Sequence, residues 1–514
     1  MKKRNDLKVV FKTYNQSQPM VLPLSLEDLI APNHPVRIVN KVIDQINIDV
    51  LLDKYKAGGT SRYHPCMLLK VLVYAYLSNI YSSRKMEEAL QQNVHFMWLA
   101  AMNKPDHNTI NRFRGERLKG VLQQIFGQVA LLLASEGLLN IKELYVDGTK
   151  IEANANRYTF VWGKAIKTNT EKIKKQLEEL WQYAQKIAAS EMDDTDPSGF
   201  DTISAEKVEK TIEKINEVLK DKEVGPKIRQ QLIYAQKNWP LNLKKYEQQQ
   251  KVMGEGRTNY SKTDPDATFM RMKEDHMLNG QLKPAYNIQI STSNQYITDY
   301  SVHQKTTDTN TLAPHLEQHK NLYGREAEII TADAGYGSEE NYQLLDEKKI
   351  TAYVKHNQFD RLQNKHIQSK KPFSTDKLYY NKDKDCYYCP MGQAMENTGT
   401  TTCKTTTGFV QTLSTYKAKN CEGCPLRGVC HQAKGNRGIE VNHHLNNLKK
   451  QAEEKLLSQE GIQHRKKRCW DVEPVFGNIK NNHHFRRFML RGKEKVSIET
   501  GLLALAHNLR KKAA

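Results

Sequence analysis

The stretch IKELYVDGT, residues 141–149, decides the fold. The sequence before it has helical periodicity, whereas Leu144 to Val146 form a short apolar run of the kind found in strands. Asp147 follows this run directly and is itself followed by Gly148. We therefore expect a strand that ends at Asp147, with the carboxylate at a sheet edge where it can take part in chemistry.

A second stretch, EIITADAGYG at residues 328–337, repeats this arrangement around Asp333. Polar turn residues separate further short strand patterns, and a helical pattern lies on each side of the second stretch. The order strand, hairpin, helix, strand, helix, strand predicts an α/β core. After the first strand, the expected elements are a β-hairpin at 286–290 and 296–302, the strand before Asp333, a helix from about Ser338 and a strand at 350–354.

The chain is strongly basic, with 78 Lys and Arg against 58 Asp and Glu, a formal net charge of +20. Such an excess attracts a polyanion and releases its counterions on contact, so nucleic acid is the leading partner. Ribosomal, membrane-surface and merely soluble proteins share this property. The sequence has no apolar run of signal-peptide or membrane-spanning length, so we expect a cytoplasmic protein without a membrane partner, associated with the nucleoid.

The 514 residues exceed the ~250 to 300 at which a single core stops growing, so several domains are expected. One region of alternating Lys and Glu is typical of solvated helices, with dimerisation or DNA contact as the alternative. The expected domains are a helical DNA-binding domain at 1–137, a core at 138–160 with 258–358 and 455–514, a helical insertion (a helical hairpin) at 161–257, and a Cys-rich insertion at 359–454.

Basic side chains cluster in PDHNTINRFRGERLKG, residues 105–120, where Asp106 or Asn108 can cap a helix. A solvated basic face and a DNA-contacting helix of helix-turn-helix type both explain the pattern. In the second case the arginines read bases or grip phosphates. The candidate DNA-contacting side chains are Arg112 and Arg114 in this segment and Arg486 and Arg487 near the carboxyl end.

A third acid, Glu473, lies beside the apolar stripe of a carboxyl-terminal helix, with Lys480 about two turns further on. Mg²⁺ prefers oxygen ligands and usually takes few carboxylates, leaving room for water and substrate phosphates. Three acids can hold two Mg²⁺ or Mn²⁺ ions, one activating a water or 3′-hydroxyl and one stabilising the departing oxygen. We therefore predict Asp147, Asp333 and Glu473 as metal ligands, with Lys480 on a phosphate, although each acid alone would be a turn or cap residue.

Two Cys-x-x-Cys pairs, CYYC at 386–389 and CEGC at 421–424, are shaped like metal knuckles. Together they can form a tetrahedral thiolate site for Zn²⁺, but the loop between them is longer than the usual ribbon spacing. Reduced, structural cysteines are the alternative. A fully thiolate-ligated zinc leaves no open position, so the site would be structural. The predicted ligands are Cys386, Cys389, Cys421, Cys424 and Cys430.

Several of these segments carry a family resemblance. YVDGTKIEANANR, ITADAGYGSEENYQLL and VEPVFGNIK resemble the three motifs of bacterial insertion-sequence transposases with a DDE catalytic triad, and NHPVRIVNKVID and PDHNTINRFR resemble the accompanying amino-terminal region. The resemblance spans nearly the whole chain. It implies an RNase H-like mixed sheet as the core.

By this resemblance, Asp147 and Asp333 match the two aspartates, Glu473 the glutamate and Lys480 the lysine seven residues on. Related transposases often have Tyr and Arg seven and four residues before the glutamate, where this chain has Lys466 and Cys469. We place the neighbouring arginines among the candidates for contact with the DNA phosphates that this Tyr and Arg would serve in related transposases. These are Arg465 and Arg468.

The function implied is cut-and-paste DNA transposition, in which water attacks first and the freed 3′-hydroxyl attacks second. Two transposon ends react together, so a homodimer on double-stranded DNA is expected, with terminal inverted repeats and target DNA as partners. A nuclease that hydrolyses without joining is one alternative. An inactive or domesticated DNA-binding protein is another. The resemblance leaves a hairpin intermediate undecided.

Overall fold

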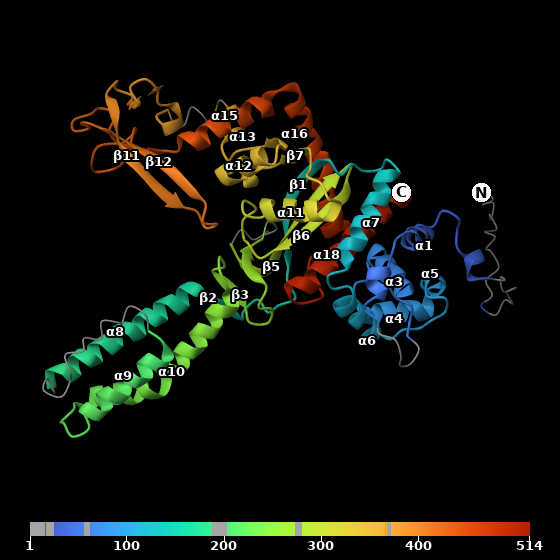
Figure 1. Ribbon diagram of the computed structural model, residues 1–514, viewed down its shortest axis with the longest axis horizontal. Helices are drawn as coiled ribbons and strands as arrows, with labels where there is room; N and C mark the ends of the chain where they lie inside the picture. Colours follow the sequence, from blue (N-terminus) through green and yellow to red (C-terminus); the bar gives the residue numbers. More distant parts are fainter. Residues whose placement is uncertain are drawn as a thin grey trace, which may run out of the picture.

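The computed structural model describes residues 16, 25–55, 62–187, 203–272, 280–364, 366 and 372–514. A mixed sheet lies at the centre, with an all-helical amino-terminal region on one side (Figure 1). A helical insertion and a second, antiparallel sheet project from the other side. The start of the predicted amino-terminal domain, residues 1–15 and 17–24, lies outside the described residues.

The amino-terminal region is helical, as predicted. Asp106 caps α6 by accepting a hydrogen bond from the backbone N–H of Thr109 at 2.9 Å, so the first of the two expected caps is confirmed. The π turn η2 then interrupts the predicted basic helix. The elements are η1 (Leu26–Leu29), α1 (Pro35–Gln45), α2 (Asp49–Leu52), α3 (Pro65–Leu77), α4 (Ser83–Gln92), α5 (Val94–Leu99), α6 (His107–Arg112), η2 (Phe113–Arg117) and α7 (Leu122–Ser135).

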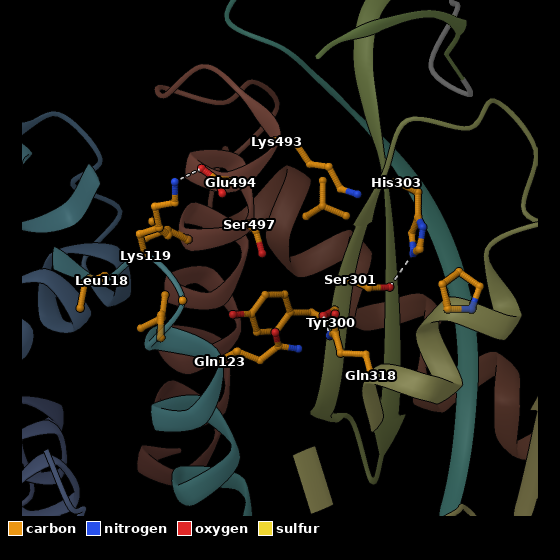
Figure 2. A pocket seen from close by; sticks show the side chains of 15 residues that line it. Leu118, Lys119, Gln123, Tyr300, Ser301, His303, Gln318, Lys493, Glu494 and Ser497 are labelled. Atoms are coloured by element: carbon orange, nitrogen blue, oxygen red, sulfur yellow. Dashed lines mark hydrogen bonds and ion pairs between the residues drawn. The ribbon is translucent and has the colours of Figure 1, made fainter. Parts of the chain in front are cut away.

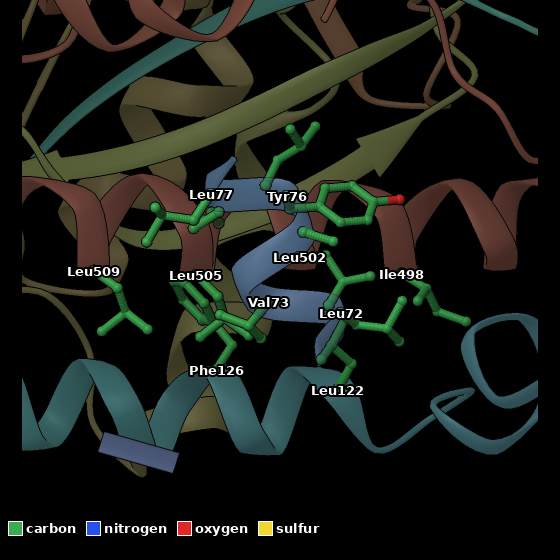
Figure 3. Close-up of a cluster of buried hydrophobic side chains, with 14 of the residues drawn as sticks. Leu72, Val73, Tyr76, Leu77, Leu122, Phe126, Ile498, Leu502, Leu505 and Leu509 are labelled. Atoms are coloured by element: carbon green, nitrogen blue, oxygen red, sulfur yellow. The ribbon is translucent and has the colours of Figure 1, made fainter. Parts of the chain in front are cut away.

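The last helix of the chain, α18 (Lys493–Ala513), connects this helical region to the sheet. Its middle is buried because it packs on α3 and α7 on one side and on the sheet on the other. Figure 3 shows Val73 of α3 and Phe126 of α7 gathered with Leu505 of α18 in one apolar cluster. Each fully buried side chain of this kind contributes roughly 1.5–3 kcal/mol, so the amino-terminal region and the core share one hydrophobic interior.

The central sheet consists of β1 (Glu143–Glu152), β4 (Thr268–Arg271), β5 (Leu282–Ser293), β6 (Tyr296–His303), β7 (Ile329–Ala332) and β8 (Thr351–Val354). β5 pairs antiparallel with β1 on one side and with β6 and β4 on the other, whereas β1, β7 and β8 run parallel. The predicted order of core elements is therefore confirmed. The mixed sheet, with its helical amino-terminal region, is an α/β fold compatible with the expected RNase H-like core.

The predicted hairpin is the β5–β6 pair. Asn294 and Gln295 form its two-residue turn, and both have positive φ angles, 53° and 63°. Such turns match the right-handed twist of the flanking strands. The parallel strands need crossover connections, which are supplied by α11 (Leu312–Tyr323) and α12 (Glu339–Glu347) on one face of the sheet.

The helical insertion contains α8 (Gly163–Ile187), α9 (Ala205–Val218) and α10 (Pro226–Met253), three helices rather than the two of the expected hairpin. The short strands β2 (Phe160–Trp162) and β3 (Asn259–Ser261) pair at its base. Its helices bury their own apolar cluster around Trp181 and Trp239. The alternating Lys and Glu therefore lie outside a small separate core, which the alternation alone did not predict.

The Cys-rich insertion forms a five-stranded antiparallel sheet, which the sequence did not predict. Its polar, threonine-rich strands lack a clear apolar alternation, and β11 is mostly exposed. The elements are α13 (Phe359–Gln363), η4 (Thr375–Lys377), β9 (Tyr380–Asn381), β10 (Cys386–Tyr388), β11 (Ala394–Lys404), β12 (Val410–Ala418) and β13 (Gly438–Val441). The chain then returns to the core through α15 (His443–Leu457), α16 (Gln459–Asp471), α17 (Glu473–Gly477) and the π turn η5 (Asn478–Asn482).

Within the described ranges, no single helix is long and apolar enough to cross a membrane. One pair of helical segments, 107–117 and 122–135, passes the same test of length and composition, but it is bent by 84°. Both segments contribute side chains to the hydrophobic interior shared with α18.

Candidate active site

The two predicted aspartates lie on neighbouring parallel strands. Val146 of β1 is in register with Ala332 of β7, and each aspartate is the next residue along its strand direction. Asp333 follows the end of β7, as expected, but β1 continues past Asp147 to Glu152. The expectation that the first strand ends at Asp147 is therefore wrong, because β1 keeps its antiparallel pairing with β5 beyond the end of β7.

Each aspartate uses one carboxylate oxygen locally. Asp147 Oδ1 accepts the backbone N–H of Gly148 at 2.8 Å, and Asp333 Oδ1 accepts that of Gly335 at 2.8 Å. The second hydrogen bond makes Asp333 the cap of the short helix η3 (Ala334–Tyr336). Both Oδ2 atoms approach the same arginine.

That arginine is Arg468, in the last turn of α16, and it contacts all three predicted acids. Its Nη2 lies 3.2 Å from Asp147 Oδ2 and 3.9 Å from Asp333 Oδ2. Its Nη1 lies 3.3 Å from Oε1 of Glu473, the first residue of α17. Three acids separated by up to 326 positions in the chain, 147 to 473, thus meet around one guanidinium.

The three carboxylates differ in exposure. The Asp147 side chain is 9% exposed, that of Asp333 38% and that of Glu473 55%. The Arg468 side chain is only 12% exposed. The cluster therefore runs from the interior of the sheet to its surface, and a large anionic substrate can reach it from the Glu473 side.

A polar stripe on α16 holds this helix against the sheet. His464 stacks on Tyr353 of β8, with ring centroids 4.5 Å apart, and its Nδ1 lies 3.0 Å from the hydroxyl of Tyr145. About two turns further on, the Asp471 carboxylate accepts backbone N–H groups from the turn of the β5–β6 hairpin, at 2.8 and 3.0 Å. These contacts fix the backbone from which Arg468 projects, and the charged sequence QHRKKRCWD did not reveal them.

Gly148 makes room for a second polar network on the other side of β1. A Cβ atom at this position would lie closer than 3.0 Å to the side chains of Gln289 and Asp308. Asp308 Oδ1 accepts hydrogen bonds from Asn287 at 2.7 Å and from Gln289 at 3.0 Å, and the Tyr336 hydroxyl donates to Gln289 Oε1. The small residue after Asp147 thus accommodates this network.

Asp308 is the acid that sequence reasoning missed. Besides Gly148, it adjoins Gly335, where a Cβ atom would lie 3.7 Å from Asp308 Oδ2. Burial raises the pKa of the Tyr336 phenol well above its ordinary value, and the negative charges of Asp308, Asp147 and Asp333 raise it further. In the segment TTDTNT Asp308 resembles a helix cap, and the backbone N–H of Thr311 does bond to its carbonyl oxygen. No signal other than its position between hairpin and helix distinguishes it.

Lys480 lies within the π turn η5 and is buried. The π turn interrupts the 3.6-residue period of the helix between Glu473 and Lys480. The contacts that join the three acids are made by Arg468.

The predicted DNA-contacting arginines fall into two groups. Arg114 is 3% exposed and donates hydrogen bonds to the Tyr76 hydroxyl at 3.1 Å and to the Tyr81 carbonyl at 2.8 Å, so it belongs to the interior. Arg465 lies 5.1 Å from the centre of the Phe359 ring and donates to the Leu456 carbonyl. The exposed members are Arg112, Arg486 and Arg487, the last of which also donates to the carbonyls of Ala153 and Ala155.

Four of the five predicted zinc ligands line one pocket of about 170 Å³ in the Cys-rich insertion, namely Cys389, Cys421, Cys424 and Cys430. Cys386 is not among the residues that line it, being buried in β10. Arg437 donates to Cys430 Sγ at 2.8 Å, and its backbone N–H donates to Cys421 Sγ at 3.4 Å.

Across the parts of the chain that the structure describes, no group of three or more His, Cys, Asp or Glu side chains is arranged to hold a metal ion. For the acids, the reason is that their oxygens are arranged around a guanidinium. The donor set itself, three carboxylates, fits Mg²⁺ or Mn²⁺. The same set of acids therefore suits a divalent ion by chemistry but is spaced here for an arginine.

A larger pocket, of about 500 Å³, lies between α18, α7 and β6, and none of the three acids lines it (Figure 2). Its wall includes the ion pair of Lys119 with Glu494 and the hydrogen-bonded Ser301 and His303. Burial, reinforced by the nearby Lys493, lowers the pKa of His303 to about 4, so this imidazole is neutral at physiological pH. At this pocket Lys119 is thus paired with Glu494, and His303 carries no charge.

Comparison with known protein families adds a decisive observation. A family model described as a transposase DDE domain matches residues 388–513, and one described as a transposase domain (DUF772) matches residues 24–116. These two matches support an insertion-sequence DDE transposase. A transposase DDE domain supports a role as a DNA-acting enzyme, and DDE transposases generally use divalent metal ions.

The two matches cover different parts of the site. Residues 388–513 include Glu473 and Arg468, and residues 24–116 include Arg112. Asp147 and Asp333 lie in neither range, so their association with Glu473 rests on the geometry described above. No curated protein and no solved structure matches the chain.

Proposed function

We propose that this transposase cleaves DNA at transposon ends and joins the freed strands to target DNA, with Asp147, Asp333 and Glu473 as ligands of two divalent ions. The observation that carries the proposal is the meeting of these three carboxylates, from β1, the end of β7 and α17, around a single positive charge. An internal cation is what three buried or half-buried acids require, and a metal ion can take its place.

When bound, the ions supply activation of the attacking oxygen and stabilisation of the departing one. The contribution of the protein is to hold the three carboxylates at one sheet edge. Asp147 is fixed by β1, Asp333 by η3, and Glu473 by the start of α17, which faces solvent. Water attacks the scissile phosphate first, and the 3′-hydroxyl so released attacks the target strand. In this proposal Lys480 binds a phosphate next to Glu473.

Basic side chains on the surface are the proposed DNA contacts. Arg112 ends α6 in the helical amino-terminal region, which we propose recognises the terminal inverted repeats. Arg486 and Arg487 are exposed just beyond η5, close in sequence to Lys480. Because two transposon ends must react together, we propose a homodimer on DNA, working in the cytoplasm on the nucleoid. The division into four domains, with the boundaries given above, is part of the same proposal.

We also propose that the Cys-rich insertion binds one structural Zn²⁺. The support is the convergence of Cys389, Cys421, Cys424 and Cys430 on one pocket, which comprises four thiols, the number that a tetrahedral site needs. For the four thiolates to surround an ion, their side chains would have to draw together and Arg437 would have to withdraw from Cys430. Cys386 is left out of this revised ligand set because it does not line the pocket.

The test of the proposed function uses the full-length Asp333→Ala variant with DNA that carries a transposon end. We expect end binding to persist and Mg²⁺-dependent cleavage to disappear. The exposed Asp360→Ala variant is the matched control, since Asp360 pairs with Lys355 at the surface. Cleavage by Asp333→Ala at the wild-type rate would contradict the site. Pre-cleaved ends test joining separately, because a nuclease would nick DNA and leave no joined product.

A further inference from the structure

Arg468 interacts with the acids of the candidate site in the way that a bound metal cation would. Both terminal nitrogens of its guanidinium contact carboxylates, and the three N–O distances lie between 3.2 and 3.9 Å. Its Nε is buried and has no hydrogen-bond partner in the described part of the chain. A guanidinium has five N–H donors and normally uses several of them when buried. The side chain is thus held by charge, with its hydrogen-bonding capacity only partly satisfied.

The same arrangement is unsuitable for a divalent ion. Mg²⁺ requires oxygen ligands at roughly 2.0–2.1 Å in nearly octahedral geometry. The acids around Arg468 are instead spaced by a planar group that is several ångströms wide, and no metal-holding group is formed among the described side chains. A divalent ion between the carboxylates would also lie next to a fixed positive charge, which repels it at short range.

We propose that Arg468 is the resident counter-cation of the metal-free site, and that it leaves the three carboxylates when divalent ions bind and turns to a DNA phosphate. This inference rests on the proposed function. Guanidinium and phosphate match in geometry and charge, so the phosphate offers Arg468 a partner as good as the one it gives up. Arg468 is therefore a positioning residue in the metal-free enzyme and a substrate contact in the loaded one.

The surroundings allow the side chain to move while the helix stays in place. α16 is fixed to the sheet by His464 and by Asp471, on either side of Arg468. Glu473, to which Nη1 bonds, is more than half exposed and opens the site to solvent. A change of side-chain rotamer is therefore sufficient, and neither the sheet nor α16 has to rearrange.

The primary test is Mn²⁺ binding to the full-length protein without DNA, followed by titration calorimetry. We expect Arg468→Gln to bind Mn²⁺ about tenfold more tightly than the wild type, because the competing charge is gone. The Mn²⁺ affinity of Arg468→Lys should fall between those of the wild type and Arg468→Gln, since lysine keeps the positive charge but lacks the planar guanidinium group. Arg465→Gln is the matched control, one turn earlier on the same helix with its guanidinium over Phe359, and it should bind Mn²⁺ like the wild type.

Equal or weaker Mn²⁺ binding by Arg468→Gln, with a melting temperature like that of the wild type, would overturn the inference. The variants Asp147→Asn and Asp333→Asn separate this failure from failure of the proposed function. If both retain wild-type Mn²⁺ affinity, the acids are not the metal site and the proposed function fails. If both lose affinity while Arg468→Gln does not gain it, only the role of Arg468 is wrong.

The proposed contact between Arg468 and a DNA phosphate is tested by repeating the Mn²⁺ titration with the protein bound to transposon-end DNA. In the wild type, DNA draws Arg468 away, so Mn²⁺ affinity should rise by a larger factor than in Arg468→Gln, where no arginine has to leave. Because such coupling is reciprocal, Mn²⁺ should also tighten DNA binding more in the wild type. Equal coupling in the two proteins would overturn the phosphate contact.

Discussion

The core and the Cys-rich insertion both bring predicted metal ligands next to an arginine, but the two arginines are held differently. Arg437 in the insertion donates to Cys430 Sγ, to the Phe373 carbonyl and, through its backbone, to Cys421 Sγ. Among the described residues, the side chain of Arg468 in the core makes its polar contacts with carboxylates, and its Nε has no partner. The first arginine is held by several directional hydrogen bonds, whereas the second is held mainly by charge, with one hydrogen bond to Glu473.

The two environments differ in how readily the arginine can be replaced by a metal ion. A side chain that is fixed by several directional hydrogen bonds resists exchange, because leaving any buried partner unsatisfied is costly. A charge balanced by charges can be replaced by another cation without leaving such a group behind. Exchange with metal ions is thus favoured in the core, whereas the insertion is suited to a permanent structural role.

The largest effect should come from the core carboxylates themselves. Replacing Asp147 by Asn keeps the shape of the side chain but removes the charge, and we expect cleavage of end DNA to fall by at least about 10³-fold, since metal-ion stabilisation of the transition state contributes several kcal/mol. Initial rates of Mg²⁺-dependent cleavage measure this effect. Cys424→Ser, in the insertion, should leave the rate nearly unchanged, and an equal loss in both variants would remove the distinction between the regions.

A smaller loss is expected for Asp308→Asn. Asp308 accepts hydrogen bonds behind Gly148 and Gly335 rather than facing the acids directly, so it positions their strands. Changes to such supporting residues typically cost 10–100-fold in metal affinity or activity, and we expect a value in this range. Mn²⁺ affinity and cleavage rate should fall together. A loss of cleavage with unaltered Mn²⁺ binding would instead point to direct contact of Asp308 with substrate.

Packing in the core is tested by Gly148→Ala. The added Cβ would collide with Gln289 and Asp308, and overpacking of this kind costs about 1–3 kcal/mol of unfolding free energy. Gly477→Ala is the matched control, because its Cβ meets nothing within 4 Å and α17 is helical there, so stability should rise by about 0.5–1 kcal/mol. Denaturant titrations of the wild type and the two variants measure these changes in the unfolding free energy.

The insertion is tested by metal analysis and chelation. Cys421→Ser should purify without zinc, and a chelator should lower the melting temperature of the wild type to that of this variant, since bound metal stabilises the folded form. Cys386→Ser should keep its zinc, because Cys386 does not line the pocket. The exposed Cys403→Ser serves as the control. Protein that contains no zinc in any form would favour reduced structural cysteines.

The smallest predicted effect is a pH dependence of core stability. Burial raises the pKa of Asp299 in β6 from 3.8 to about 7. A carboxyl whose pKa is higher in the folded state stabilises the fold at low pH, and this contribution is lost as the pH rises from about 4 through 7. Asp299→Asn should therefore melt on the order of 5 °C higher than the wild type at pH 8 and nearly equally at pH 4. Thermal scans that show the same difference at both pH values would contradict this account.

The sequence alone predicted the order of the core elements, since apolar runs of strand length and turn residues such as Asn294 and Gln295 carry local information. It also placed Asp333 at the end of a strand and identified the family through short motifs. It did not determine the extent of β1, the sheet of the Cys-rich insertion or the burial of Arg114. Each of these depends on partners that are far away in the chain.

The packing of distant elements brought Arg468 between three acids, set Asp308 behind Gly148 and left Cys386 out of the pocket that four other cysteines line. Strand register, such as that of Val146 with Ala332, and the docking of α16 decide these positions. The physical reason is that residue spacing specifies which face of one element a side chain occupies, whereas its neighbours across elements follow from how complete faces pack together.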